Sequence, residues 1–239
     1  MIRVAAVGDI HVGMDSGDDA RQLFDGVDAD ADVLLLAGDL TRIGDASEAD
    51  LVASAIEGAG VPVVAVLGNH DFHSDAAPKV QASLEAAGAI VLEGDSATLE
   101  LPDGTLGVAG SKGFGGGFAG ASGTAFGEPE MKAFIRHTES LAERLQDSLA
   151  QLRTDVRVAL LHYSPVKDTL VGERLEIFPF LGSYLLGEAI DHAGADLAVH
   201  GHAHGGTEKG VTPGGIHVRN VAQPVIRAPY SVYCFNGHR

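Results

Sequence analysis

The sequence predicts an α/β fold, and three observations lead to this prediction. Short apolar runs at residues 1–7, 32–37 and 61–67 are typical of buried strands. Stretches of helical character lie between these runs, and each run ends in a glycine followed by polar side chains. Ligands of open α/β sheets bind beyond the carboxyl ends of the strands. The polar side chains at these ends are therefore candidate functional residues.

The first strand, MIRVAAV, ends in Gly8-Asp9-Ile10-His11. Asp9 and His11 are two residues apart, so they point to the same side of an extended chain. A carboxylate beside an imidazole is a plausible half-site for a divalent metal. Residues 15–31 carry acidic side chains around a few apolar ones, which predicts a helix with polar flanks.

The second and third strands repeat this arrangement. Residues 32–37 lead to Gly38-Asp39, and a helix is expected over 45–60. Residues 61–67 lead to Gly68-Asn69-His70-Asp71. Taken alone, this tetrapeptide is explained equally well as a turn with a capping aspartate. Glycine plus metal-competent residues after three successive strands favours a functional site.

The middle of the chain predicts a helix at 80–87 and short strands at 89–92, 98–101 and 106–109. The segment 110–127 follows, with eight glycines, but it lacks the Gly-Lys-Ser/Thr ending of a P-loop. Two interpretations are equally good here: a mobile loop near the mouth of a site, or an irregular surface loop whose phenylalanines enter the core.

The C-terminal half predicts helices at 130–152 and 183–193 and strands at 156–161, 196–199, 216–221 and 232–235. The strand at 156–161 ends in His162, and the strand at 196–199 ends in His200-Gly201-His202-Ala203-His204. No linker interrupts the chain, so residues 1–239 are expected to form one domain. Its candidate specificity loops are 110–130 and 165–182.

Composition disfavours several classes of protein. The formal charge of −17 disfavours a nucleic-acid polymer as partner. Small phosphorylated substrates stay compatible with it, because bound divalent ions reverse the local potential. No apolar run approaches the roughly 18 residues of a membrane helix, and no secretory signal is recognisable. The single cysteine, Cys234, suits a reducing cytoplasm and is expected to be a buried small hydrophobe.

Five strand ends together offer oxygen and nitrogen donors and no thiolate. The candidate residues are Asp9, His11, Asp39, Asn69, His70, His162, His202 and His204. Such donors suit Mn²⁺, Fe or Zn²⁺ rather than a structural zinc site. Eight residues are too many for one ion and about right for two.

The order Asp-x-His, Gly-Asp, Gly-Asn-His-Asp, His, Gly-His-x-His resembles the motif series of the calcineurin-like metallophosphoesterases, from residue 8 to residue 204. The resemblance implies a four-layer α/β sandwich, two mixed sheets packed face to face with helices outside. It also implies a dinuclear metal site. The implied ligands are Asp9, His11 and His204 for the first metal, Asn69, His162 and His202 for the second, and Asp39 as the bridge.

This inventory suits the chemistry of phosphate-ester hydrolysis. Two ions about 3.5–4 Å apart can activate a bridging hydroxide that attacks phosphorus in line. Mn²⁺ is the expected ion, with Fe or Zn²⁺ as alternatives. His70 would not bind metal; it would stabilise the transition state or protonate the leaving oxygen. Asp71 would orient His70 or cap the next helix, with the cap slightly favoured.

Other residues have two interpretations each. Arg42, Lys167 and Arg174 are candidate substrate contacts, although solvated surface positions explain them as well. We expect His200 to be a packed or second-layer histidine and His73 to be a loop residue.

The predicted function is that of a cytoplasmic phosphodiesterase acting on a small or nucleotide-like phosphorylated substrate. A phosphomonoesterase or a pyrophosphohydrolase is the alternative within enzymes. A non-catalytic scaffold of the same fold is the alternative outside them. Every implied ligand position is filled and His70 is present, which argues against the scaffold. The sequence predicts no oligomeric state.

Overall fold

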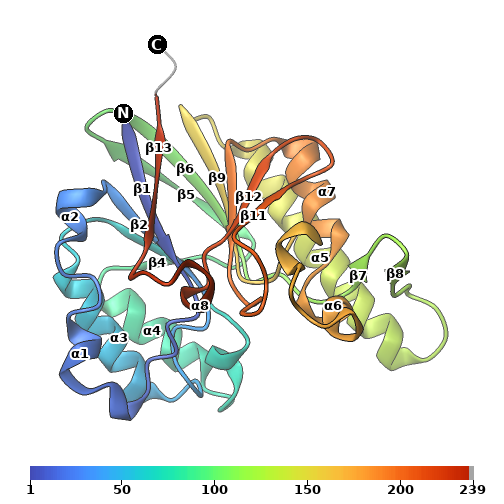
Figure 1. The fold of residues 1–239 in the computed structure, drawn as a ribbon, viewed down its shortest axis with the longest axis horizontal. Helices are drawn as coiled ribbons and strands as arrows, with labels where there is room; N and C mark the ends of the chain where they lie inside the picture. Colours follow the sequence, from blue (N-terminus) through green and yellow to red (C-terminus); the bar gives the residue numbers. More distant parts are fainter. Residues whose placement is uncertain (237–239) are drawn as a thin grey trace.

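Two mixed β-sheets pack face to face, and helices cover the outer face of each sheet (Figure 1). This computed structural model describes residues 1–236 of the chain. The first sheet has the strand order β13-β1-β2-β3-β4, with β1 to β4 parallel and β13 antiparallel at one edge. Its strands are β1 (Ile2–Val7), β2 (Val33–Ala37), β3 (Val63–Val66), β4 (Ile90–Val91) and β13 (Ser231–Phe235).

The second sheet has the order β11-β12-β10-β9-β6-β5. Its four inner strands are parallel, and the two edge strands β11 and β5 are antiparallel to their neighbours. The strands are β5 (Asp95–Leu101), β6 (Gly104–Ser111), β9 (Val156–Leu161), β10 (Leu197–His200), β11 (Lys209–Val211) and β12 (His217–Asn220).

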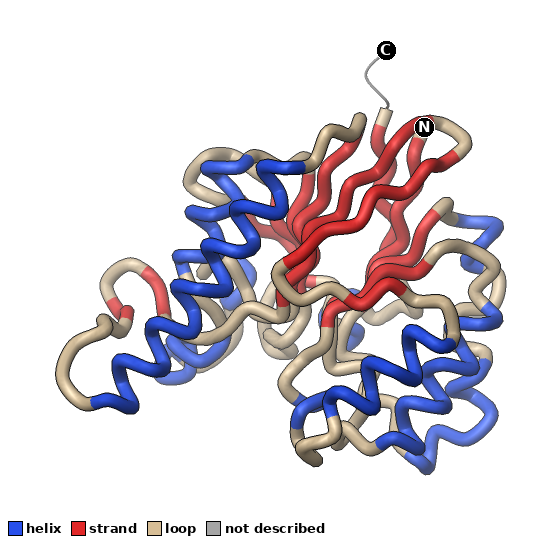
Figure 2. The backbone as a smooth tube through the Cα atoms, turned by 180° about the vertical axis from the view of Figure 1, so that it is seen from behind, coloured by secondary structure: helices blue, strands red, loops and turns tan. Residues whose placement is uncertain are grey.

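The helices form the two outer layers, which lie on opposite sides of the strands when the fold is seen from behind (Figure 2). The first sheet is covered by α1 (Gly17–Arg21), α2 (Val27–Asp30), α3 (Ala46–Gly58) and α4 (Ala77–Ala86). The second is covered by α5 (Pro129–Gln151) and α7 (Tyr184–Ala193). Shorter elements are η1 (Met14–Ser16), η2 (His70–Phe72), β7 (Gly117–Phe118), β8 (Ala121–Ser122), η3 (Asp168–Leu170), η4 (Leu175–Ile177), α6 (Phe178–Leu181) and α8 (Gln223–Ile226).

Alternation along the strands builds one apolar core for each pair of adjacent layers. In β2, Leu34 and Leu36 face the helices, whereas Val33 and Leu35 face the second sheet. All four side chains are fully buried. Complete burial of one such side chain contributes about 1.5–3 kcal/mol. The four-layer architecture predicted from the motif series is therefore confirmed, with buried residues between all its layers.

Some local predictions were wrong. The helix expected over 15–31 is two short helices, because Gly26 takes a left-handed conformation (φ 80°) between them. Strand β11 and helix α8 were not predicted. Cys234 is exposed, because β13 is an edge strand whose alternate side chains face solvent.

Each of the two interpretations of the Gly-rich segment 110–127 holds for part of it. Phe118 is buried in the short β7–β8 hairpin, whereas Phe126 is 82% exposed. The segment 165–182 contains η3, η4 and α6, so it is more ordered than a plain loop.

Candidate metal centre

The carboxyl ends of parallel strands in both sheets meet at one edge of the sandwich. Strands β1, β2 and β3 end there from the first sheet, and β6, β9 and β10 end there from the second. Each of the eight candidate metal-site residues lies within four residues of the end of one of these strands. Their metal-competent atoms gather into two groups with one shared member.

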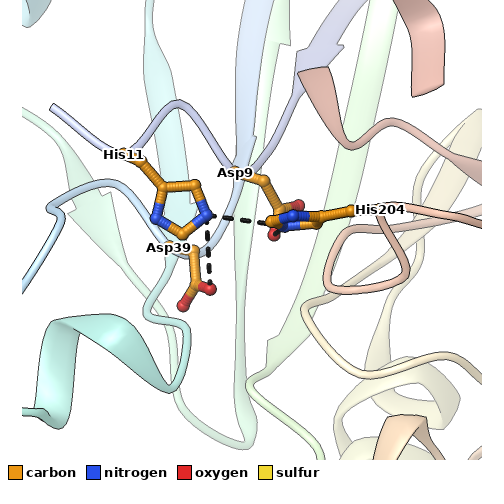
Figure 3. A group of neighbouring side chains, drawn as sticks. All are labelled: Asp9, His11, Asp39 and His204. Carbon is orange, nitrogen blue, oxygen red and sulfur yellow. Dashed lines mark hydrogen bonds and ion pairs between the residues drawn. The ribbon is translucent and has the colours of Figure 1, made fainter. Parts of the chain in front are cut away.

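The first group contains Asp9, His11, Asp39 and His204, whose ligand atoms all lie within 4.8 Å of one another (Figure 3). His204 Nε2 is 2.7 Å from Asp9 Oδ1, and His11 Nε2 is 3.4 Å from His204 Nε2. The four side chains follow β1, β2 and β10, and they converge on one point. The structure thus brings together the residues expected at the first metal.

The second group contains Asp39, His162 and His202, again within 4.8 Å. Asn69 adjoins it, because its Oδ1 lies 3.0 Å from His162 Nε2. Asp39 Oδ1 is 3.3 Å from the same nitrogen, and Asp39 Oδ2 is 3.9 Å from His11 Nε2. One carboxylate therefore faces both groups, as a bridging ligand must.

Backbone strain is concentrated at this centre. Asp9, His11, Asp39 and His202 have positive φ values of 57°, 43°, 51° and 71°. Side chains other than glycine adopt this region rarely and at a cost of about 1–3 kcal/mol each. Strain of this kind persists only when the surrounding structure over-determines it, and it clusters at functional sites. The cluster is thus positioned for more than stability.

Two glycines allow the loops to approach this closely. A Cβ on Gly68 would lie 2.1 Å from Asp39 Oδ1, and a Cβ on Gly201 would lie 2.2 Å from Asp9 Oδ2. Any side chain at either position would displace one of the carboxylates. The glycine in each motif therefore makes room for a carboxylate from a different strand end.

Backbone carbonyls determine which imidazole nitrogen is free. His162 is fully buried, and its Nδ1–H donates to the Ala37 carbonyl at 2.8 Å. Because a carbonyl only accepts, the Nε2 lone pair of neutral His162 points toward Asn69 and Asp39. A hydrogen bond of this kind behind a metal-binding histidine orients the ring and increases its basicity.

His70 is held by a similar hydrogen bond. Its Nδ1–H donates to the Arg42 carbonyl at 2.7 Å, and its Nε2 lies 3.9 Å from Asp39 Oδ2. His70 belongs to neither ligand group. It therefore presents Nε2 at the edge of the centre, where a substrate oxygen would lie.

Asp71 neither orients the His70 ring nor caps the next helix, the two roles expected of it. Its buried carboxylate accepts hydrogen bonds from the amides of Leu40, Thr41 and Gly68 and from the Thr41 hydroxyl. Within residues 1–236, no hydrogen bond joins it to the His70 ring or to α4. Asp71 instead ties the loop after β2 to the loop after β3, and so fixes Asp39 relative to Asn69.

The electrostatics of the centre are set by buried carboxylates beside imidazoles. Burial raises the pKa of Asp39, although His162 opposes the shift. Burial also acts to raise the pKa of Asp9, but the hydrogen bond with His204 and the nearby imidazoles lower it overall. The same hydrogen bond raises the pKa of His204.

Two of the imidazoles are kept neutral by their surroundings. Burial lowers the pKa of His11 to about 4 and that of His202 to about 3. Their nitrogen lone pairs are therefore available to a metal at neutral pH. Two nearby buried carboxylates and neutral imidazoles form a donor set that fits divalent ions, which would offset the repulsion between the carboxylates.

The three candidate substrate contacts have exposed side chains. The Arg42 guanidinium pairs with Asp15 at 2.6 Å, and both side chains are largely exposed. Lys167 lines a separate cavity of about 320 Å³, beside Phe118 and Tyr184. Arg174 is exposed at the start of η4.

His73 and His200, which lie beside the motifs and were not expected to bind metal, are where we expected them. His73 is an exposed loop residue at the end of η2. His200 is fully buried, with Nδ1 bonded to the Gly201 carbonyl and Nε2 to the Thr169 hydroxyl.

Sequence reasoning missed Lys112, which follows β6 directly. It is only 9% exposed, and its Nζ lies about 5 Å from the rings of Phe72, Phe114 and Tyr163. Burial lowers its pKa, while Glu93 and Asp39 oppose the shift. The sequence does contain the pattern that marks the other site residues, because Gly110-Ser111-Lys112 is a glycine followed by polar residues at a strand end. This pattern was overlooked because it lies within the Gly-rich segment 110–127.

Comparisons with known proteins agree with this geometry. Residues 2–206 match the family model described as calcineurin-like phosphoesterase, so the chain belongs to that family. It is a metal-dependent phosphoesterase, and the Asp/His clusters described above suit divalent metal binding. A search of the curated proteins found no match.

Several solved structures share the fold at low sequence identity. Phosphopantetheinyl hydrolase of Mycobacterium tuberculosis aligns with a TM-score of 0.64 and 15% identity, over 94% of this chain and 90% of that one. A candidate 5′-nucleotidase of Staphylococcus aureus, in complex with alpha-ketoglutarate, aligns with a TM-score of 0.57 and 15% identity, over 92% of this chain and 48% of that one. A Thermus thermophilus protein called TT1561 aligns with a TM-score of 0.53 and 17% identity, over 92% of this chain and 88% of that one.

Within residues 1–236, no helix combines the length and the apolar character needed to cross a bilayer.

Proposed function

We propose that this phosphoesterase hydrolyses a phosphodiester in a small or nucleotide-like substrate, using two divalent ions, with Mn²⁺ as the expected metal. The observation that carries the proposal is the pair of ligand groups that share Asp39. Two ions bound there would supply Lewis acidity and would activate a water for direct attack on phosphorus. No covalent phospho-enzyme is required.

Each ligand has a role in this proposal. Asp9, His11 and His204 would hold the first ion, Asn69, His162 and His202 would hold the second, and Asp39, which belongs to both groups, would be shared by the two. The neutral amide of Asn69 keeps negative charge low around the second position. The Ala37 carbonyl keeps His162 in the tautomer that a metal requires.

His70 is the proposed catalytic residue. Its Nδ1–H is anchored on the Arg42 carbonyl, so Nε2 is the nitrogen that faces the reacting group. When both nitrogens are protonated, Nε2–H can stabilise charge on a phosphoryl oxygen or donate the proton to the leaving oxygen. A positioned general acid of this kind contributes about 10²–10⁴-fold in rate.

Substrate choice is assigned to the segments 110–130 and 165–182, with Arg42, Lys167 and Arg174 as candidate contacts. Arg42 is the most favourable of these, because its own carbonyl holds His70. Phosphopantetheinyl hydrolase, one of the structural neighbours, is named for a small phosphorylated group, which agrees with a small substrate. The single cysteine suits a reducing cytoplasm, where we place the protein.

Metal content and turnover test the proposal together. Elemental analysis should find two metals per chain. Bis-p-nitrophenyl phosphate should then be cleaved faster than p-nitrophenyl phosphate with added Mn²⁺. Two metals with a preference for the monoester would favour a phosphomonoesterase, and selective cleavage of a nucleoside diphosphate would favour a pyrophosphohydrolase. A chain that stays metal-free and inert after Mn²⁺ is added would be a scaffold.

A further inference from the structure

Lys112 is a buried cation beside the centre that the proposed mechanism leaves without a role. Its carbonyl accepts hydrogen bonds from the amides of His162 (3.2 Å) and Tyr163 (2.9 Å). The pairing of Ser111 with Leu161 places Lys112 opposite His162 at the ends of β6 and β9. Its backbone is therefore fixed next to a proposed metal ligand.

The ammonium group of Lys112 lies in an aromatic enclosure with few acceptors. Nζ is 5.2, 4.9 and 5.4 Å from the ring centroids of Phe72, Phe114 and Tyr163. It donates one long hydrogen bond, 3.4 Å, to the Gly113 carbonyl. Within residues 1–236, no carboxylate forms an ion pair with it inside 4.0 Å. An ammonium has three N–H donors, so donor capacity is left over.

The enclosure adjoins the centre, because its Tyr163 ring packs against two of the proposed ligands. The Tyr163 ring lies 4.3 Å from the His202 ring and 5.5 Å from the His162 ring, centroid to centroid. Phe72 lies two residues after His70, in the same 3-10 turn, and is 43% exposed. Lys112 thus reaches from the second sheet toward the loop that carries the proposed general acid.

We propose that Lys112 binds a phosphoryl oxygen of the substrate beside the second metal position, an inference that rests on the proposed function. Glu93 and Asp39 attract the ammonium without a hydrogen bond to it. A phosphoryl oxygen would supply an anionic acceptor within hydrogen-bonding distance. Charge-assisted hydrogen bonds are shorter and roughly twice as strong as neutral ones. The three rings exclude water around the pair, which strengthens the attraction further.

A purely structural role makes a different prediction. If the lysine stem only fills space between the rings, an apolar side chain of similar length can replace it. Lys112→Met keeps that volume and removes the charge, while Lys112→Arg keeps the charge. The exposed Lys79 on α4, changed to Met, is the matched control for loss of one positive charge.

The measurement is calorimetric binding of inorganic phosphate to the Mn²⁺-loaded protein. We expect Lys112→Met to bind phosphate about 10- to 100-fold more weakly than wild type, with unchanged metal content. Lys112→Arg should recover part of the affinity, and Lys79→Met should match wild type. In turnover assays, KM should rise more than kcat falls for Lys112→Met.

Several results would overturn the inference. One is a metal-loaded, folded Lys112→Met that binds phosphate as wild type does; a wild-type protein that carries two metals and binds no phosphate is another. Either contradicts the role of Lys112 and leaves the metal centre standing. A wild-type chain that binds no metal contradicts the proposed function as well. Should Lys112→Met fail to fold by near-UV circular dichroism, Lys112→Gln replaces it in the same assay.

Discussion

The two sheets contribute different chemistry to one centre. The loops of the first sheet supply both carboxylates, Asp9 and Asp39, together with an amide and two imidazoles. The proposed ligands from the second sheet are all imidazoles, and the cation Lys112 lies beside them. Negative charge therefore comes from the first sheet alone, and the second sheet contributes only imidazoles to the proposed ligands. The donors of both proposed metal positions come together only when the two sheets are packed against each other.

The link between the sheets is made by the site residues themselves. Asp9 of the first sheet accepts hydrogen bonds from the His202 amide and the His204 ring of the second. His162 of the second sheet donates to the Ala37 carbonyl of the first. The predictions below test how far this division of roles holds.

The largest effect is expected at the carboxylate that both groups share. Asp39→Asn should lower metal affinity by at least about 100-fold. Removing a residue that only forms a hydrogen bond to a metal ligand already lowers metal affinity by about 10–100-fold, and Asp39 is a proposed ligand itself. Activity should fall with metal content, and the rise in melting temperature that Mn²⁺ produces in wild type should disappear. Elemental analysis and thermal unfolding measure both, with the exposed Asp19→Asn as control. If Asp39→Asn kept two metals per chain and full turnover, Asp39 would not be the bridging ligand.

His70→Ala tests whether the first sheet also supplies a residue that acts without binding metal. The variant should keep both metals and lose about 10²–10⁴-fold in kcat, because only proton transfer and charge stabilisation are removed. Metal analysis and steady-state kinetics separate the two, with the exposed His217→Ala as control. If metal were lost in proportion to rate, His70 would be a ligand.

Asp71 and Asn220 provide a matched pair of loop ties, one for each sheet. Asp71 accepts four hydrogen bonds within the first-sheet loops, whereas fully buried Asn220 bonds Ala203 and Ala222 in the second. We expect Asp71→Ala to lower the free energy of unfolding by about 2–4 kcal/mol and Asn220→Ala by about 1–3 kcal/mol. Urea unfolding of the metal-free protein measures both. Equal losses would mean that charge and bond number do not distinguish the two ties.

The smallest effect is expected at Arg42. Its ion pair with Asp15 is exposed, so Arg42→Met should lower the free energy of unfolding by less than about 1 kcal/mol. Because its carbonyl, and not its side chain, holds His70, kcat should change little. A rise in KM without a change in kcat would identify the guanidinium as a substrate contact. A large fall in kcat would place it in the chemistry.

Much of the site could be predicted because each motif is local. A buried apolar run, a glycine and a metal-competent side chain lie within a few residues of one another, as in residues 1–11 and 61–71. The four layers followed once the motif series was recognised. Lys112 escaped because its importance depends on three rings from distant parts of the chain. Cys234 was predicted wrongly because strand patterns do not reveal which strand lies at an edge.

The sequence by itself determined the donor chemistry: two carboxylates, an amide and a set of imidazoles, each placed after a strand. The family resemblance implied how these donors divide between two groups, and only the tertiary structure showed how close they lie and which nitrogen of His162 and of His70 is free. His204 meets Asp9 across 195 residues, and the Ala37 carbonyl selects the tautomer of His162 across 125. Such contacts are made by the packing of one sheet on the other, and no local pattern encodes where two distant loops will meet.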